Sequence, residues 1–153
     1  MNLLAIGRLR NGPEAELFER YNTRLRPRLT VTELPEARGT PAVIKRKECL
    51  ALLGALPRDA FVVPLDLGGR AIGSEALAVE LVRWGGLSRQ LYFVIGGAEG
   101  LDAAFLARGD YILSLGEMTW PHFLVRAMLA EQLYRAHSVV RGHPYHRSDR
   151  PTM

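Results

Sequence analysis

Short apolar runs alternate along the chain with longer segments in which apolar residues recur at helical spacing. The runs predict strands over residues 2–6, 29–34, 60–65, 91–95 and 111–115. The segments between them predict helices that begin near Pro13, Thr40, Ser74, Asp102 and Pro121. Alternating strands and helices are typical of a sheet covered by helices on both faces. We therefore predict one α/β domain over residues 1–153, with a mostly parallel sheet.

Several local signals support these boundaries. Pro13 suits the first turn of a helix, and Thr40 followed by Pro41 is typical of an N-cap and the first helical position. Ser74 is the expected N-cap of the third helix. Residues 29–34 alternate apolar and polar side chains, which predicts a strand at the edge of the sheet.

The last predicted helix has little polar surface. From Pro121 to position 136 its only charged residues are Arg126, Glu131 and Arg135, of which the last two are spaced for an i,i+4 ion pair. Such a helix is normally covered on more than one side. A central position in a monomer and contact with a second copy both explain the pattern, and we favour a homodimer.

Composition limits the class of protein. The chain has 153 residues, 48% of them hydrophobic and 24% charged, as in an ordinary globular domain. Its single cysteine, Cys49, excludes an intrachain disulfide and lies on a predicted core face. Because no apolar run is long enough for a membrane span or a signal peptide, we expect no membrane partner and a cytoplasmic location. The net charge of +4 favours an acidic partner without identifying one.

Candidate ligand-binding residues follow from the sheet. In open α/β sheets, ligands bind beyond the carboxyl ends of the strands, which directs attention to the loops after Leu65, Ile95 and Leu115. The loop at 96–100 reads GGAEG and lacks the spacing of a dinucleotide or P-loop motif. A glycine loop that exposes backbone amides to a ligand and a plain strand-to-helix turn both fit it.

Two basic segments are further candidates. Residues 141–147 read RGHPYHR, in which Tyr145 offers a flat surface for stacking a base. His143 and His146 have no third metal ligand nearby, so we expect no metal site. Contact with RNA and a solvated basic tail remain alternatives for this segment. The cluster at 38 and 45–47 is likewise either an RNA-facing strip or a solvated helix face.

The chain resembles a known family in its C-terminal run, EMTWPHFLVRAMLAEQLYRAH at 117–137 and GHPYHR at 142–147. With FVIGGAEGL at 93–101, VVPLDLGGR at 62–70 and the opening LAIG, it resembles the ribosomal RNA large subunit methyltransferase H family over essentially its whole length. That family belongs to the SPOUT class. The resemblance implies a C-terminal deep trefoil knot, a homodimer, and S-adenosylmethionine as methyl donor with no metal.

The resemblance also implies a donor site at the knot, held largely by backbone groups. The matching positions are Leu65, Gly96, Leu115, Gly116, Glu117, Met118, Thr119 and Trp120. The sequence between Leu115 and Met118 differs from the family pattern, so at Gly116 and Glu117 we expect contacts through the backbone rather than through side chains.

The implied reaction is methylation of N3 of a pseudouridine in large-subunit rRNA, within the assembled ribosome. We expect His146 with Tyr145 to position the base and assist loss of the N3 proton. Arg126 or Arg135 would stabilise negative charge on the ring oxygens, and Arg135, His143 and Arg147 would contact RNA.

Three other functions fit parts of the sequence. A SPOUT methyltransferase acting on another nucleotide, such as a tRNA base, would share the fold. A non-catalytic ribosome-binding or assembly factor would keep the fold without the chemistry. A flavodoxin-like nucleotide-binding module would need a phosphate loop after the first strand, and the sequence lacks one.

Overall fold

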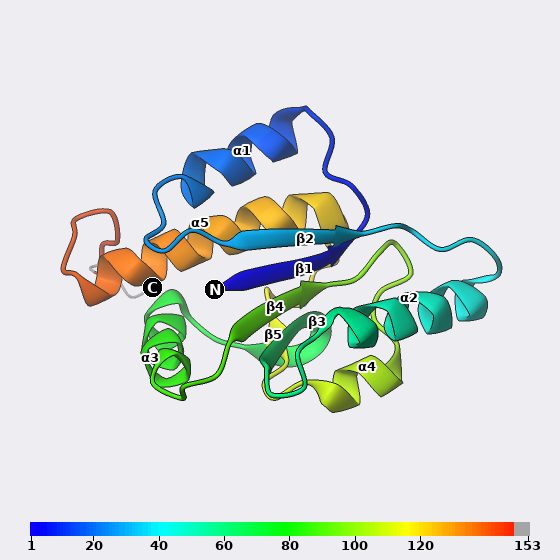
Figure 1. Cartoon of the computed structure of the whole chain (residues 1–153). Helices are drawn as coiled ribbons and strands as arrows, with labels where there is room; N and C mark the ends of the chain where they lie inside the picture. Colours follow the sequence, from blue (N-terminus) through cyan, green and yellow to red (C-terminus); the bar gives the residue numbers. More distant parts are fainter. Residues whose placement is uncertain (149–153) are drawn as a thin grey trace.

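A five-stranded sheet with the order β2-β1-β4-β3-β5 forms the centre of the protein, whose computed structural model describes residues 1–148 (Figure 1). The strands are β1 (Asn2–Ile6), β2 (Thr30–Leu34), β3 (Phe61–Ala71), β4 (Leu91–Ile95) and β5 (Leu113–Ser114). The helices are α1 (Pro13–Asn22), α2 (Pro41–Ala55), α3 (Ser74–Gly85), α4 (Ala103–Arg108) and α5 (His122–Val140). All four strand pairings are parallel, which confirms the predicted α/β class with a parallel sheet.

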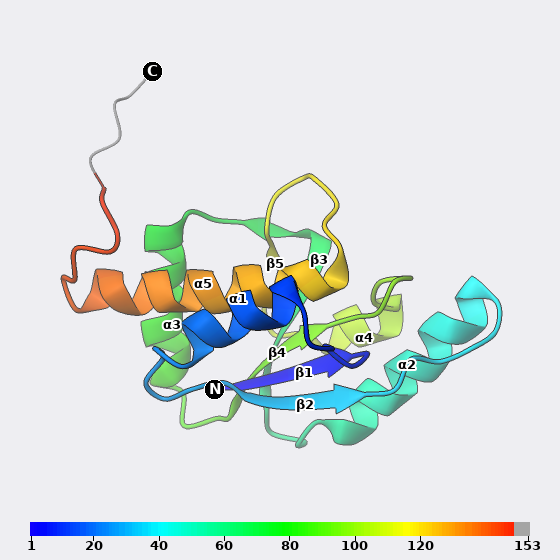
Figure 2. The same ribbon diagram turned by 90° about the horizontal axis from the view of Figure 1, so that it is seen from above.

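Each face of the sheet carries its own core. Leu3 and Ala5 of β1 point to the face covered by α1, α3 and α5, whereas Leu4 and Ile6 point to the face covered by α2 and α4 (Figure 2). This division follows from the two-residue period of a strand. On the first face Trp84 is fully buried among aromatic neighbours, with its ring centroid 5.6 Å from that of Phe61.

The predicted edge strand and one predicted cap are confirmed. β2 pairs only with β1 and occupies one end of the sheet. Thr40 is the N-cap of α2, and its hydroxyl accepts a hydrogen bond from Val43 N at 3.4 Å. The expectation for Ser74 is wrong: Gly73 is the N-cap of α3, and Ser74 is the first helical residue. Its hydroxyl donates instead to Gln132 Oε1 of α5 at 2.7 Å.

The third and fifth strands differ in length from the predicted ones. β3 continues to Ala71 rather than ending at residue 65, because it pairs with β5 on both sides of a register shift between Leu65 and Arg70. Such a shift bends the strand, so that β3 pairs with β4 in its first half and with β5 further along. β5 is only Leu113–Ser114 rather than 111–115, so the chain leaves the sheet early and enters the loop before α5.

The last helix packs along α1 and α3, and its Ala127, Ala130, Leu133 and Ala136 are buried. Small residues on this face allow the neighbouring helices to approach closely. The predicted Glu131–Arg135 ion pair is present. None of the helices within residues 1–148 is long and apolar enough to cross a membrane.

Candidate functional site

A pocket of about 190 Å³ opens where the loops after β3, β4 and β5 meet. The three loops singled out from the sequence therefore converge in the structure. The residues that line the pocket are Leu65, Asp66, Leu67, Ile95, Gly96, Gly97, Ala98, Gly100, Leu101, Leu115, Gly116, Thr119, Trp120, His122 and Val125.

The glycine loop after β4 brings Gly96, Gly97 and Gly100 to the pocket, together with the small side chain of Ala98. Gly100 N–H donates to Gly97 O at 3.0 Å, and Gly100 has a φ of +78°, which favours glycine. A Cβ on Gly97 would lie 2.9 Å from Glu48 Oε2. Glu48 is itself buried, and desolvation raises the pKa of its carboxyl. The side chain of Glu48 thus packs closely against the glycine loop.

The loop that enters α5 supplies the opposite wall. Gly116 has a φ of +112°, and its N–H donates to the Ser114 hydroxyl at 3.2 Å. Trp120 brings a large apolar surface, and its indole N–H is buried without a hydrogen-bond partner among the described residues. Glu117 and Met118 do not line the pocket, and Met118 is 66% exposed. The other six expected donor-site residues do line it.

His122 is a pocket residue that the sequence reasoning did not select. It is the first residue of α5, and its Nε2 is buried without a hydrogen-bond partner in residues 1–148, lying 3.8 Å from Glu36 Oε1. Desolvation lowers the pKa of this imidazole, Glu36 opposes the shift and Arg126 adds to it. The ring is therefore neutral near pH 7. Its position directly after the loop at 115–121 was the signal that could have identified it.

Arg126 lies inside the protein, away from the pocket lining. Only 1% of its side chain is exposed, and its guanidinium donates to Ile6 O at 3.0 Å, Gly7 O at 2.6 Å and Glu33 Oε2 at 2.5 Å. These contacts fasten α5 to the carboxyl end of β1. With its donors directed inward, Arg126 has a structural role, and we assign it no contact with substrate.

The C-terminal segment folds back on the second half of α5. The Tyr145 hydroxyl donates to Glu131 Oε1 at 3.0 Å, and the Arg135 guanidinium lies over the Tyr145 ring at 4.9 Å. His146 Nε2 lies 3.3 Å from Glu75 Oε1 of α3. Burial and the neighbouring Tyr21 and Glu131 raise the pKa of Tyr145, which keeps its hydroxyl protonated.

This segment and the pocket are separate within one chain. None of residues 143–147 is among those that line the pocket. The structure thus brings the expected donor residues together but does not bring the expected base-contacting residues to them.

A family model described as "Predicted SPOUT methyltransferase" matches residues 1–146. The chain belongs to the SPOUT methyltransferase family. It is 59% identical over 151 residues to the ribosomal RNA large subunit methyltransferase H of Gluconacetobacter diazotrophicus, covering 99% of both chains. It is 53% identical to the protein of that name from Acidiphilium cryptum, covering 99% of this chain and 96% of the relative.

A solved structure supports the same fold. The chain resembles a probable methylase family protein from Haemophilus influenzae with a TM-score of 0.57 at 13% identity, over 99% of this chain and 71% of that one. At this identity the likeness concerns the fold alone.

SPOUT methyltransferases take the methyl group from S-adenosylmethionine, and the residues that line the pocket suit part of such a donor. Leu65, Leu115 and Trp120 offer apolar walls for an adenine ring, and the glycine loop presents backbone groups to polar parts of the molecule. The Asp66 carboxylate lies in the lining, where it can face the positive charges of the donor. Within residues 1–148 no group of three His, Cys, Asp or Glu side chains is placed to hold a metal ion.

Proposed function

We propose that this protein is a cytoplasmic rRNA methyltransferase that transfers a methyl group from S-adenosylmethionine to N3 of a pseudouridine in large-subunit rRNA of the assembled ribosome. The observation that carries the proposal is the pocket at the carboxyl ends of β3, β4 and β5, which is lined by six of the residues expected at the donor site, in a chain that matches the SPOUT family model. The names of the relatives at 59% and 53% identity support rRNA as the substrate.

The donor would lie in this pocket with its methyl group directed out of the opening. Leu65, Gly96, Leu115, Gly116, Thr119 and Trp120 hold it, mostly through apolar contact and backbone hydrogen bonds. The neutral His122 can exchange a hydrogen bond with the donor or with the base without adding a positive charge beside a sulfonium. Glu117 and Met118 contribute to the site through the backbone path of the loop rather than through their side chains.

A homodimer completes the active site in this proposal. The pocket volume of about 190 Å³ is below the ~300 Å³ at the lower end of small-molecule sites, so part of the donor remains uncovered by one chain. A second hollow of about 500 Å³ lies between α5, α1 and the segment that joins β3 to α3, and it shares Leu115 and Gly116 with the pocket. Its apolar rim includes Leu17 and Met128, a surface suited to a second copy.

The tail of the partner chain would then lie over the donor. Tyr145 and His146 would hold the pseudouridine and ease loss of its N3 proton, which the base must lose when N3 attacks the methyl carbon. Arg135 lies beside Tyr145 and can stabilise negative charge on the ring oxygens. His143 and Arg147 would contact the surrounding RNA.

Mixing two inactive variants tests this arrangement directly. Gly97→Leu distorts the glycine loop that lines the pocket, because even a Cβ there lies 2.9 Å from Glu48, whereas Tyr145→Phe with His146→Ala removes the tail functions. If the site is shared, mixed dimers have one intact site, and random mixing restores about a quarter of wild-type methyl transfer. Absence of any restoration, in mixtures shown to exchange subunits, would refute the shared site.

Calorimetric titration with S-adenosylmethionine separates the enzyme from a non-catalytic ribosome-binding factor that shares the fold. The proposal requires binding and the transfer of labelled methyl groups to ribosomes that lack the modification. A protein that binds ribosomes but not the donor would be such a factor. Transfer to tRNA instead of ribosomes would identify a SPOUT methyltransferase of different substrate.

A further inference from the structure

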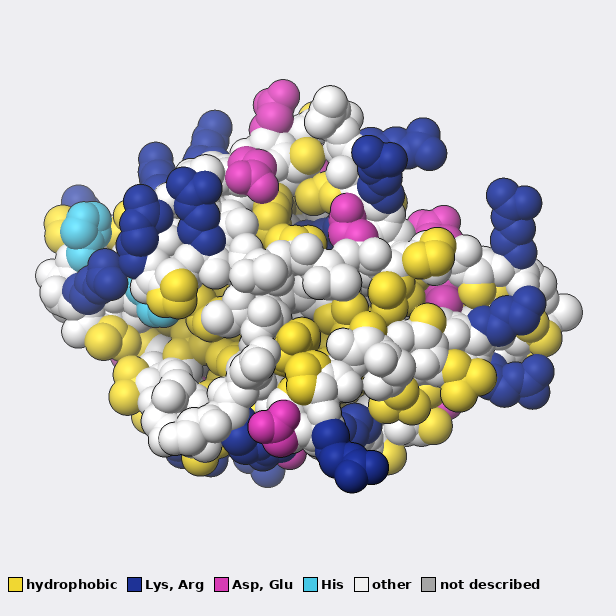
Figure 3. Space-filling view, viewed as in Figure 1, with side chains coloured by type: hydrophobic (Ala, Val, Ile, Leu, Met, Phe, Trp, Pro, Cys, Tyr) yellow, Lys and Arg dark blue, Asp and Glu magenta, His cyan; other side chains and the backbone are white. Residues whose placement is uncertain are grey.

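A basic hollow of about 600 Å³ lies between the residues that follow α1 and the end of α5, apart from the donor pocket. We call it the arginine groove and define it by Arg24, Arg26, His137, Arg141 and His143. None of the acidic residues within 1–148 lines it. Figure 3 shows dark-blue Lys and Arg side chains with a cyan histidine at this end of the molecule.

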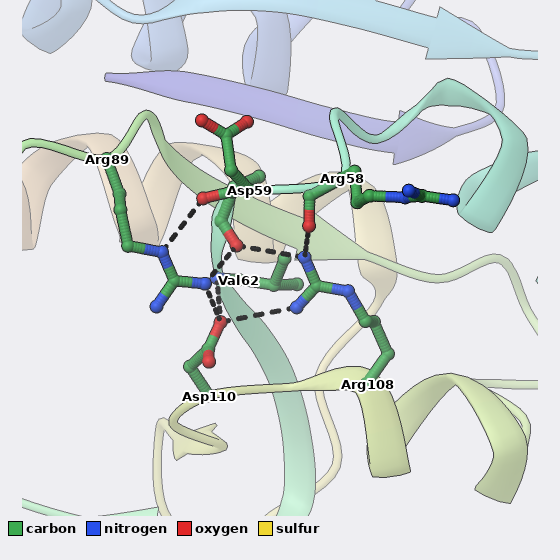
Figure 4. A network of polar contacts seen from close by, with 7 residues as sticks. Arg58, Asp59, Val62, Arg89, Arg108 and Asp110 are labelled. Carbon is green, nitrogen blue, oxygen red and sulfur yellow. Dashed lines mark hydrogen bonds and ion pairs between the residues drawn. The ribbon is translucent and has the colours of Figure 1, made fainter.

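The guanidinium groups of the groove have no carboxylate partner among the residues that the structure describes. Arg24, Arg26 and Arg141 are exposed, and none forms an ion pair with a carboxylate in the described part of the chain. A second arginine cluster, at the start of β3, behaves differently: Arg89 and Arg108 both bind Asp110 and donate to Ala60 O (Figure 4). The guanidinium groups of that cluster are occupied by contacts within the protein, whereas the groove retains its positive charge.

The groove is also pre-organised. Arg26 Nη1 donates to Thr23 O at 2.7 Å and Leu25 O at 2.8 Å, which holds this side chain against the end of α1. His143 N–H donates to Ser138 O at 2.9 Å after Gly142 ends α5 with a φ of +66°. Fixed donors lose less conformational entropy when they bind an anion than mobile surface side chains do.

Two histidines give the groove further donors. His143 Nδ1 accepts a hydrogen bond from Tyr145 N–H at 3.2 Å, so the neutral ring carries its proton on Nε2 and can donate it to a ligand. Burial lowers the pKa of His137, and the charges of Arg141 and the N-terminal amino group lower it further. The arginine side chains that line the groove give it a positive charge, which favours an anion.

From these features we propose that the arginine groove binds the phosphodiester backbone of the RNA substrate, beside the nucleotide that is methylated. Arg24, Arg26 and Arg141 match phosphate oxygens in charge and geometry. His143 and Pro144 line the groove and lead directly into Tyr145 and His146, so a strand lying in the groove presents its next nucleotide to those two side chains. The proposal rests on the proposed function for the identity of the RNA.

The test compares two pairs of charge-removing substitutions in the full-length protein. Arg24→Gln with Arg141→Gln removes two groove charges, and Arg38→Gln with Arg46→Gln removes two exposed charges around the start of α2. Binding of each to ribosomes that lack the modification is measured by fluorescence anisotropy across a salt series, together with methyl-transfer kinetics. Thermal melting and S-adenosylmethionine titration confirm that each variant folds and binds the donor.

The groove pair should bind ribosomes about tenfold more weakly, with a salt slope smaller by about 1.5, as expected for two lost phosphate contacts. Its KM for ribosomes should rise with little change in kcat, and lysines at both positions should restore most of the affinity. In NMR titrations the pKa of His137 should rise when RNA binds. Wild-type affinity and salt slope in the groove pair, or an equal loss in the α2 pair, would overturn the proposal.

These outcomes remain distinct from those of the proposed function. If the wild-type protein methylates ribosomes and the groove pair behaves like it, the groove proposal fails and the enzyme assignment stands. If the wild-type protein binds RNA through the groove but transfers no methyl group, the groove proposal stands and the enzyme assignment fails.

Discussion

Replacing Arg126 with methionine separates a structural role for this arginine from a catalytic one. Methionine fills a similar volume but leaves Ile6 O and Gly7 O without the donors that now lie 3.0 and 2.6 Å away. It also leaves Glu33 without its cationic partner. Removing one member of a buried ion pair typically costs about 3–5 kcal/mol. Because the Glu33 side chain is 32% exposed and can be hydrated, we expect the lower end, about 3 kcal/mol.

Urea unfolding followed by circular dichroism measures this change. In a domain of this size a loss of about 3 kcal/mol lowers the melting temperature by roughly 6–12 °C. Glu33→Gln is the matched control, and it should lose only about 1 kcal/mol because the amide oxygen still accepts a hydrogen bond. The reasoning is refuted if Arg126→Met loses less than about 1 kcal/mol while methyl transfer is abolished, since Arg126 would then act on the substrate.

Three further changes test other parts of the structure. Gly97→Ala should weaken S-adenosylmethionine binding about tenfold in calorimetry, because its Cβ meets Glu48 Oε2 at 2.9 Å, whereas Gly54→Ala, with open space around it, should bind the donor normally. Burial would raise the pKa of Glu33, but its hydrogen bonds and nearby arginine charges outweigh burial and lower it. The lowered pKa stabilises the folded protein above the unfolded-state pKa of about 4.3, and this stabilisation is lost as the pH falls through the folded-state pKa. The unfolding free energy of Glu33→Gln should therefore change less with pH in the acid range than that of the wild type. Thr40→Ala should cost about 1 kcal/mol in urea unfolding by removing the cap of α2, and no loss would show that the cap contributes nothing.

The helices and most strands could be predicted because their apolar periods are regular. β1 and β4 match the predicted ranges, since both are buried on two faces and read as unbroken apolar runs. The second half of β3 could not be predicted, because residues 66–71 are polar and glycine-rich and become a strand only through pairing with β5. Ser74 was misassigned because its hydroxyl has a better partner in Gln132, which no local pattern reveals.

The candidate site was partly predictable for similar reasons. The rule that ligands bind at the carboxyl ends of strands identified the three loops that form the pocket. The roles of Arg126 and of the tail depend on contacts between residues far apart in the sequence, such as Arg126 with Glu33 and His146 with Glu75. The trefoil knot implied by the resemblance to the SPOUT class stays a prediction.

Mass-spectrometric mapping of large-subunit rRNA decides whether this protein methylates a pseudouridine. Ribosomes from a strain that lacks this protein are incubated with S-adenosylmethionine and the purified chain, and each modified nucleotide is then located. We expect one pseudouridine that lacks its N3 methyl group in the deletion strain and regains it in the reaction. An unchanged modification pattern in both samples, with protein that binds the donor, would contradict it.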